Sequence, residues 1–86
     1  MFKTYIMAAT RQDVDRWIAT AKENGSQYIV SVCDTFDWGD YPVYCRNKKE
    51  LSEAIAEYNG KNMQCINEVI EIKGDKVTEN LNPYSF

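Results

Sequence analysis

Four stretches of the chain have the apolar pattern of β-strands. Residues 2–9 predict a first strand, in which Thr4, Ile6 and Ala8 would face one side and Tyr5, Met7 and Ala9 the other. Residues 28–33 form a β-branched apolar run, which is typical of a central strand covered on at least one face. Residues 41–46 predict a short third strand, and Pro42 near its start indicates an edge position or the entry of the strand, because proline has no N–H to donate. Residues 68–73 predict the last of the four strands.

The alternation in the last strand assigns its two faces. We expect Ile70 and Ile72 to point inward and Val69 to point outward. Residues 74–75, Gly-Asp, have the composition of a two-residue hairpin turn. Residues 76–79 then allow a short fifth strand at an edge of the sheet, which the pattern permits but does not require.

Two further stretches carry apolar residues at the spacing of one helix face. The positions i, i+3, i+4 and i+7 are Val14, Trp17, Ile18 and Ala21 in the first and Leu51, Ala54, Ile55 and Tyr58 in the second. Thr10 and Asn47 have the side chains of helix N-caps, and Asp13 and Glu50, three residues later, are placed to close capping boxes. Each predicted helix ends at Asn-Gly, where glycine can adopt a positive φ.

The same strand–helix–strand unit thus occurs twice and predicts one α+β domain over residues 1–80. Two such units joined by a hairpin have the order βαββαβ, the ferredoxin-like arrangement, with a four-stranded antiparallel sheet and two helices on one face. Residues 81–86 form a C-terminal tail, which is either mobile or docked through its two aromatic residues. The sheet face without helices would display Tyr5, Met7, Tyr44 and a residue of the central strand such as Ile29.

Composition narrows the class of protein. Eighty-six residues make one small domain, and a net charge of −3 argues against a generic nucleic-acid binder, which usually has a basic face. No apolar run approaches the ~20 residues of a membrane span. The N-terminus also lacks the features of a secretory signal. We therefore expect a cytoplasmic protein without membrane contact, located in the host cytoplasm if its source is viral.

Catalysis and cofactor binding have little support. The chain has no histidine, so the commonest general base is absent, and it has no glycine-rich phosphate-binding loop. Cys33, Cys45 and Cys65 are odd in number and have no metal-binding spacing, so we expect reduced, buried thiols. Cys45 precedes Arg46 near a helix start, which is a weak indication of a reactive thiol. We expect no enzyme activity, no cofactor and no metal.

The connector between the two units, residues 33–42, is the best indication of function. It interleaves aspartates with aromatic residues and has no positive charge. Aromatic residues often anchor interfaces, and the carboxylates would orient a basic partner. The predicted partner-binding residues are Asp34, Phe36, Asp37, Trp38, Asp40, Tyr41 and Tyr44. Alternatively, Phe36 and Trp38 fold back to cap the core.

The same aspartates leave a metal alternative open. Asp34, Asp37 and Asp40 have D-x-x-D-x-x-D spacing, which lacks the alternate ligands and the final glutamate of an EF-hand. Three carboxylates on a tight loop would hold Ca²⁺ or Mg²⁺ weakly.

Residues 47–73 resemble the second half of an RNA recognition motif. They have the capped helix with Ala54-Ile55, the Asn-Gly turn and the alternating last strand of that family. The resemblance implies base stacking on the open sheet through Tyr5 and Tyr44, with Met7 on the same nucleic-acid-binding face. The basic, glycine-rich signature of the third strand is absent, and the acidic connector would repel phosphate.

The chain is also similar in style to the small accessory proteins of large bacterial viruses. It is short and acidic, rich in Tyr, Asn and Lys, and without a catalytic signature. This likeness implies a protein that binds and inhibits a host factor. We therefore expect a non-enzymatic protein that engages a partner with a basic surface. A nucleic-acid partner and a homodimer stay open as alternatives.

Overall fold

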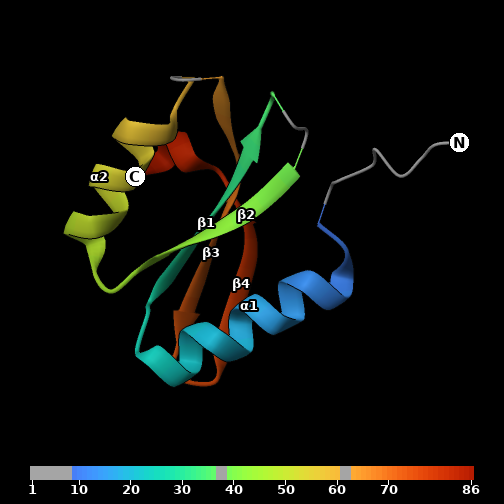
Figure 1. Cartoon of the computed structure of the whole chain (residues 1–86). Coiled ribbons are helices and arrows are strands. Elements are labelled where there is room, and N and C mark those ends of the chain that lie inside the picture. The colour runs from blue at the N-terminus through green and yellow to red at the C-terminus, as the bar shows by residue number, and fades with distance from the viewer. Residues whose placement is uncertain (1–8, 37–38, 61–62) are drawn as a thin grey trace, which may run out of the picture.

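The computed structural model describes residues 9–36, 39–60 and 63–86. The elements in chain order are α1 (Arg11–Asn24), β1 (Tyr28–Asp34), β2 (Gly39–Cys45), α2 (Lys48–Tyr58), β3 (Gln64–Lys73), β4 (Lys76–Leu81) and the 3₁₀ helix η2 (Pro83–Ser85). The four strands form one antiparallel sheet in the order β2-β1-β3-β4 (Figure 1). The predicted α+β class is confirmed, with two helices, a four-stranded antiparallel sheet and an order of elements compatible with a ferredoxin-like layout. The predicted strand at residues 2–9 lies almost wholly outside the described residues.

Strand β1 is the centre of the sheet. It pairs with β2 on one side and with β3 on the other, as its apolar run predicted. Residues 28–32 are all buried, so both faces of this strand are covered. Strand β2 is an edge strand in the described sheet and carries Pro42, so the edge position is the one of the two predicted alternatives that applies.

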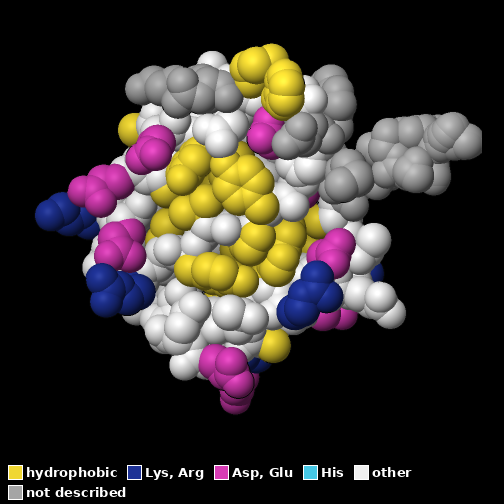
Figure 2. Space-filling view, in the orientation of Figure 1, with side chains coloured by type: hydrophobic (Ala, Val, Ile, Leu, Met, Phe, Trp, Pro, Cys, Tyr) yellow, Lys and Arg dark blue, Asp and Glu magenta, His cyan; other side chains and the backbone are white. Residues whose placement is uncertain are grey.

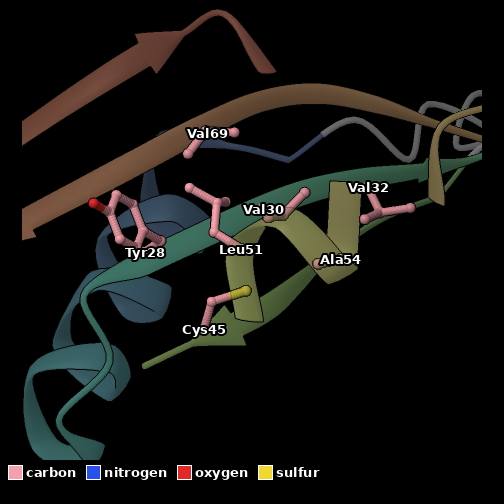
Figure 3. Packing of buried hydrophobic residues seen from close by; sticks show 7 residues of the cluster. All are labelled: Tyr28, Val30, Val32, Cys45, Leu51, Ala54 and Val69. Carbon is pink, nitrogen blue, oxygen red and sulfur yellow. The ribbon is translucent and has the colours of Figure 1, made fainter. Parts of the chain in front are cut away.

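The two helices pack against opposite faces of the sheet. Leu51 and Ala54 of α2 belong to one buried cluster, here named the α2 cluster, together with Tyr28, Val30, Val32, Cys45 and Val69 (Figure 3). Trp17 of α1 belongs to a second buried cluster, here named the α1 cluster, which consists of Val14, Trp17, Ala21, Ile29, Ile70 and Ile72. Neighbouring strand residues point to opposite faces, so Ile29 and Val30 place α1 and α2 on opposite sides (Figure 1).

This placement corrects two expectations. Both helices were expected on one face, with Ile29 on an open face, but Ile29 is fully buried in the α1 cluster. Val69 was expected to point outward, but it is fully buried in the α2 cluster. The physical reason is the same for both, because a residue that points away from one helix meets the other.

Both helices begin at the predicted caps. The Asp13 N–H donates to Thr10 Oγ1 over 3.1 Å and the Thr10 N–H donates to Asp13 Oδ2 over 3.0 Å, which completes a capping box. At α2, the Glu50 N–H donates to Asn47 Oδ1 over 2.9 Å. The Glu50 carboxylate accepts instead from the N–H of Arg46, one residue before the cap.

The C-terminal residues 76–86 make more contacts with the rest of the domain than a free tail would. Strand β4 has six residues, runs to Leu81 and pairs with β3, so the stretch expected as a short fifth strand is a full member of the described sheet. Pro83 is buried, and the Phe86 ring packs edge-on against Tyr28 with ring centroids 6.0 Å apart. Of the two aromatic residues expected to dock, Phe86 packs on Tyr28, whereas Tyr84 is 69% exposed and only its hydroxyl donates to Asn59 Oδ1 over 2.9 Å.

No helix in the described ranges has the length and apolar character needed to cross a membrane.

Candidate functional site

Three hydrogen bonds hold the turn that follows β1. The Asp34 Oδ1 accepts from the Phe36 N–H over 2.9 Å, which is the geometry of an Asx turn. The carbonyl oxygen of Met63 accepts from the Thr35 N–H over 2.7 Å and from the Thr35 hydroxyl over 2.5 Å. These bonds tie the turn to the start of β3, so its backbone is fixed at this end of the sheet.

Phe36 and Met63 are both exposed at this end. The two residues are 71% and 58% exposed, although each is large and apolar. The N–H and the hydroxyl of Thr35 both donate to the Met63 carbonyl. Phe36 follows Thr35 in the chain, so Phe36 and Met63 lie on either side of this Thr35–Met63 contact. We call Phe36 and Met63 with the Asp34 turn the loop end. Phe36 does not fold back onto the core; Asp37 and Trp38 lie outside the described residues.

Asp34 and Asp40 point to opposite faces of the β1–β2 hairpin. Asp34 pairs with Gly39, and Asp40 pairs with Cys33, so the two aspartates are at positions of opposite parity. Asp34 is engaged in the turn, and Asp40 Oδ2 accepts from the Ala9 N–H over 2.9 Å. The described part of the chain contains no group of three or more His, Cys, Asp or Glu that could hold a metal ion. Asp37, the third aspartate of the metal alternative, lies outside it.

Tyr41 and Tyr44 also belong to opposite faces. Tyr41 packs against the α2 cluster, edge-on to Tyr58 with ring centroids 6.3 Å apart, and its hydroxyl oxygen accepts from the Gln64 amide. Burial raises the pKa of Tyr41, and the nearby Tyr58 and Asp34 add to the increase. Tyr44 packs against the α1 cluster. The predicted partner-binding residues therefore do not form one flat patch.

Half-buried apolar side chains gather along the β2 edge. Figure 2 shows hydrophobic atoms over β2, between the charged surfaces of the two helices. Tyr41 and Val43 of β2, with Ile55 and Tyr58 of α2, are half-buried and pack against the α2 cluster. This edge adjoins the loop end through Gly39, which pairs with Asp34.

The open sheet expected for nucleic-acid stacking does not appear in the described residues. A helix packs on each face, and Tyr44 is half-buried against the α1 cluster. Tyr5 and Met7, the other two residues of that hypothesis, lie outside the described residues.

Cys45 is buried rather than reactive. Its side chain packs in the α2 cluster, and burial raises the pKa of the thiol to about 11, with the nearby Glu50 adding to the increase. The thiolate is the nucleophilic form, so this environment suppresses reactivity at neutral pH. The position of Cys45 near the start of a helix predicted a lower thiol pKa, but the effect of burial is larger.

Comparison of the chain with protein-family models, curated proteins and solved structures found no match.

Met63 is the residue of the loop end that sequence reasoning missed. It lies 27 positions after Phe36, and only the pairing of β1 with β3 brings the two together. Its φ of 62° is unusual for a residue other than glycine or asparagine and costs about 1 kcal/mol. No local signal in the sequence marks this position, because the contact depends on strand register.

Proposed function

We propose that this protein is a small binding protein that engages a macromolecular partner through the loop end and inhibits that partner by occlusion. The observation that carries the proposal is the exposed Phe36 on a turn fixed by hydrogen bonds, with the exposed Met63 beside it. Phenylalanine and methionine are enriched in protein interfaces. A fixed turn also loses little conformational entropy when it binds.

The backbone of Met63 supports a role in contact rather than in stability. Glycine or asparagine would adopt φ 62° more readily, so an exposed methionine there lowers stability without filling the core. Strained backbone positions cluster at functional sites. Contact with a partner explains why a long apolar side chain is placed on such a position.

The charge of the loop end favours a partner with a basic surface. Asp34 and Asp40 lie on the two faces of the hairpin that carries Phe36, and Asp37 lies between them in sequence. Carboxylates around an apolar anchor mainly speed association and set orientation. Tyr41 and Tyr44 would adjoin the contact. A host factor bound by a viral accessory protein is the kind of partner that the style of the sequence suggests.

The test is capture of a partner from a lysate of the natural host, with and without nuclease, followed by mass spectrometry. Wild-type protein should retain a protein whose capture survives nuclease. Phe36→Ala and Met63→Gly should each weaken that capture, by roughly 30-fold in Kd for an anchor worth about 2 kcal/mol. Met63→Gly should also leave the Tm unchanged or raise it, because glycine removes the strained φ.

Phe86→Ala is the matched control, because it removes an aromatic ring at the opposite end of β1, where Phe86 packs on Tyr28. It should retain the partner at wild-type level. Equal capture by Phe36→Ala, Met63→Gly and wild type would refute the loop end as the contact. Capture abolished by nuclease would assign the partner as nucleic acid.

A further inference from the structure

Cys33 and Cys65 face each other across the two central strands. They are direct partners in the antiparallel register of β1 and β3, and both are unpaired thiols on half-buried residues. Directly opposite residues in an antiparallel pair have Cα atoms about 4.5–5.5 Å apart. Disulfides span about 4.4–6.8 Å between Cα atoms. The backbone therefore already has the separation that a bond between these two residues needs.

We propose that Cys33 and Cys65 form a modification site, a dithiol that a peroxide converts to an intramolecular disulfide. One thiolate attacks a peroxide oxygen, the O–O bond breaks, and a cysteine sulfenic acid forms. The second thiol attacks that sulfur, the S–S bond forms, and water leaves. In total, two thiols and one hydrogen peroxide give one disulfide and two waters. A dithiol reductant reverses the modification by thiol–disulfide exchange.

A Cys33–Cys65 disulfide would lie close to the loop end. Two residues beyond Cys33 and two before Cys65, the Thr35 N–H donates to the Met63 carbonyl. A disulfide would therefore cross-link β1 and β3 next to the hydrogen bonds that fix the turn. The chemistry does not depend on the proposed function, because the bond would form whether or not Phe36 contacts a partner.

The surroundings of Cys33 predict slow oxidation at neutral pH. Burial raises the pKa of Cys33 to about 11, and Cys65 on β3 and Asp40 on β2 add to the increase. Those two are the titratable groups that face Cys33 among the described residues. Attack on the peroxide requires the thiolate, and little thiolate is present at neutral pH. The disulfide should therefore form mainly when the protein is exposed to added peroxide. Its rate should rise up to tenfold for each unit of pH between 7 and 10.

The test treats the full chain with hydrogen peroxide, blocks free thiols with iodoacetamide and maps disulfides by mass spectrometry without reduction. Folded wild type and Cys45→Ala should give the Cys33–Cys65 peptide pair and lose two hydrogen atoms in mass. Cys33→Ser and Cys65→Ser should give no intramolecular disulfide. Wild type oxidised in urea provides the reference, because the unfolded chain should give all three cysteine pairings.

The melting temperature and the pattern of products give two further measurements. Oxidised wild type should have a higher Tm than reduced wild type, and a reductant should restore the original value. The proposal is overturned if folded protein gives disulfides through Cys45, only linked dimers, or only sulfinic acids. It is also overturned if folded protein and urea-unfolded protein give the same mixture of pairings.

Discussion

Ile29 and Val30 provide a direct test of the two-faced core. Both are fully buried, but Ile29 contacts the α1 cluster and Val30 the α2 cluster. Ile29→Val removes one methyl group and should cost about 0.5–1.5 kcal/mol. Val30→Ala removes two carbons, worth about 1.6 kcal/mol in transfer free energy before any cavity cost. A chain of this length is expected to have roughly 4–13 kcal/mol of stability in total, so both variants should fold.

The assay uses Trp17, which lies in the same cluster as Ile29. The chain has two tryptophans, so a Trp38→Phe background leaves Trp17 as the single reporter. Urea titration gives the free energy of unfolding. The wavelength of tryptophan emission and its quenching by acrylamide report the surroundings of Trp17. Ile29→Val should shift the emission or quenching of the folded protein, whereas Val30→Ala should change neither, although Val30→Ala is the more destabilising variant.

The opposite order of effects would refute this reasoning. If Val30→Ala changes Trp17 in folded protein as much as Ile29→Val does, the two helices share one face. A global loosening would be recognised by a lower slope of free energy against urea, because the slope follows the surface exposed on unfolding. Both variants should keep the wild-type slope.

Three further predictions concern the helix caps and the β2 edge. Asn47→Ala should lower the free energy of unfolding by about 1 kcal/mol in urea titrations, while Asn47→Ser, which can still cap, should cost much less. Hydrogen bonds from backbone N–H groups hold the pKa of Asp13 and of Glu50 below their ordinary values, so the stability they add is present above about pH 4.5 and is lost as pH falls further. The Tm should therefore fall on acidification below that pH, and less steeply in an Asp13→Asn/Glu50→Gln variant. Tyr41→Phe removes the acceptor for the Gln64 amide and should cost about 0.5–1.5 kcal/mol in urea; no change would mean that water replaces the bond.

Local elements of this fold were readable from the sequence. The helices, their caps and the central position of β1 follow from short-range patterns, and the structure has them where those patterns lie. The sequence singles out Phe36 in the connector but leaves open whether it folds back onto the core, and the structure has it exposed. What could not be read depends on register: Met63 beside the turn, and Cys65 opposite Cys33. Those pairs join residues about 30 positions apart, and no local period carries that information.

The face of the sheet on which each helix packs also depends on the arrangement of the strands rather than on the helix sequence. Both helices carry the same apolar spacing, which predicts that each packs on a sheet but not on which side. A signal was present in β1, where residues 28–32 run nearly without a polar interruption, as in strands covered on both faces. In β3, Val69 and Ile70 are adjacent and both fully buried, which is the same signal in a shorter form.

Covering both faces has a consequence for where a partner can bind. A ferredoxin-like sheet with both helices on one side would leave a broad face for contact, and the nucleic-acid hypothesis depended on such a face. With α1 and α2 on opposite sides, the exposed apolar residues of the described chain lie at the loop end and at the C-terminal Tyr84 and Phe86, and half-buried ones follow the β2 edge. Pro42 has no N–H to offer at that edge, which disfavours pairing with a further strand. Both features are compatible with the proposed side-chain contact through Phe36 and Met63, which does not require an open sheet face or an added strand.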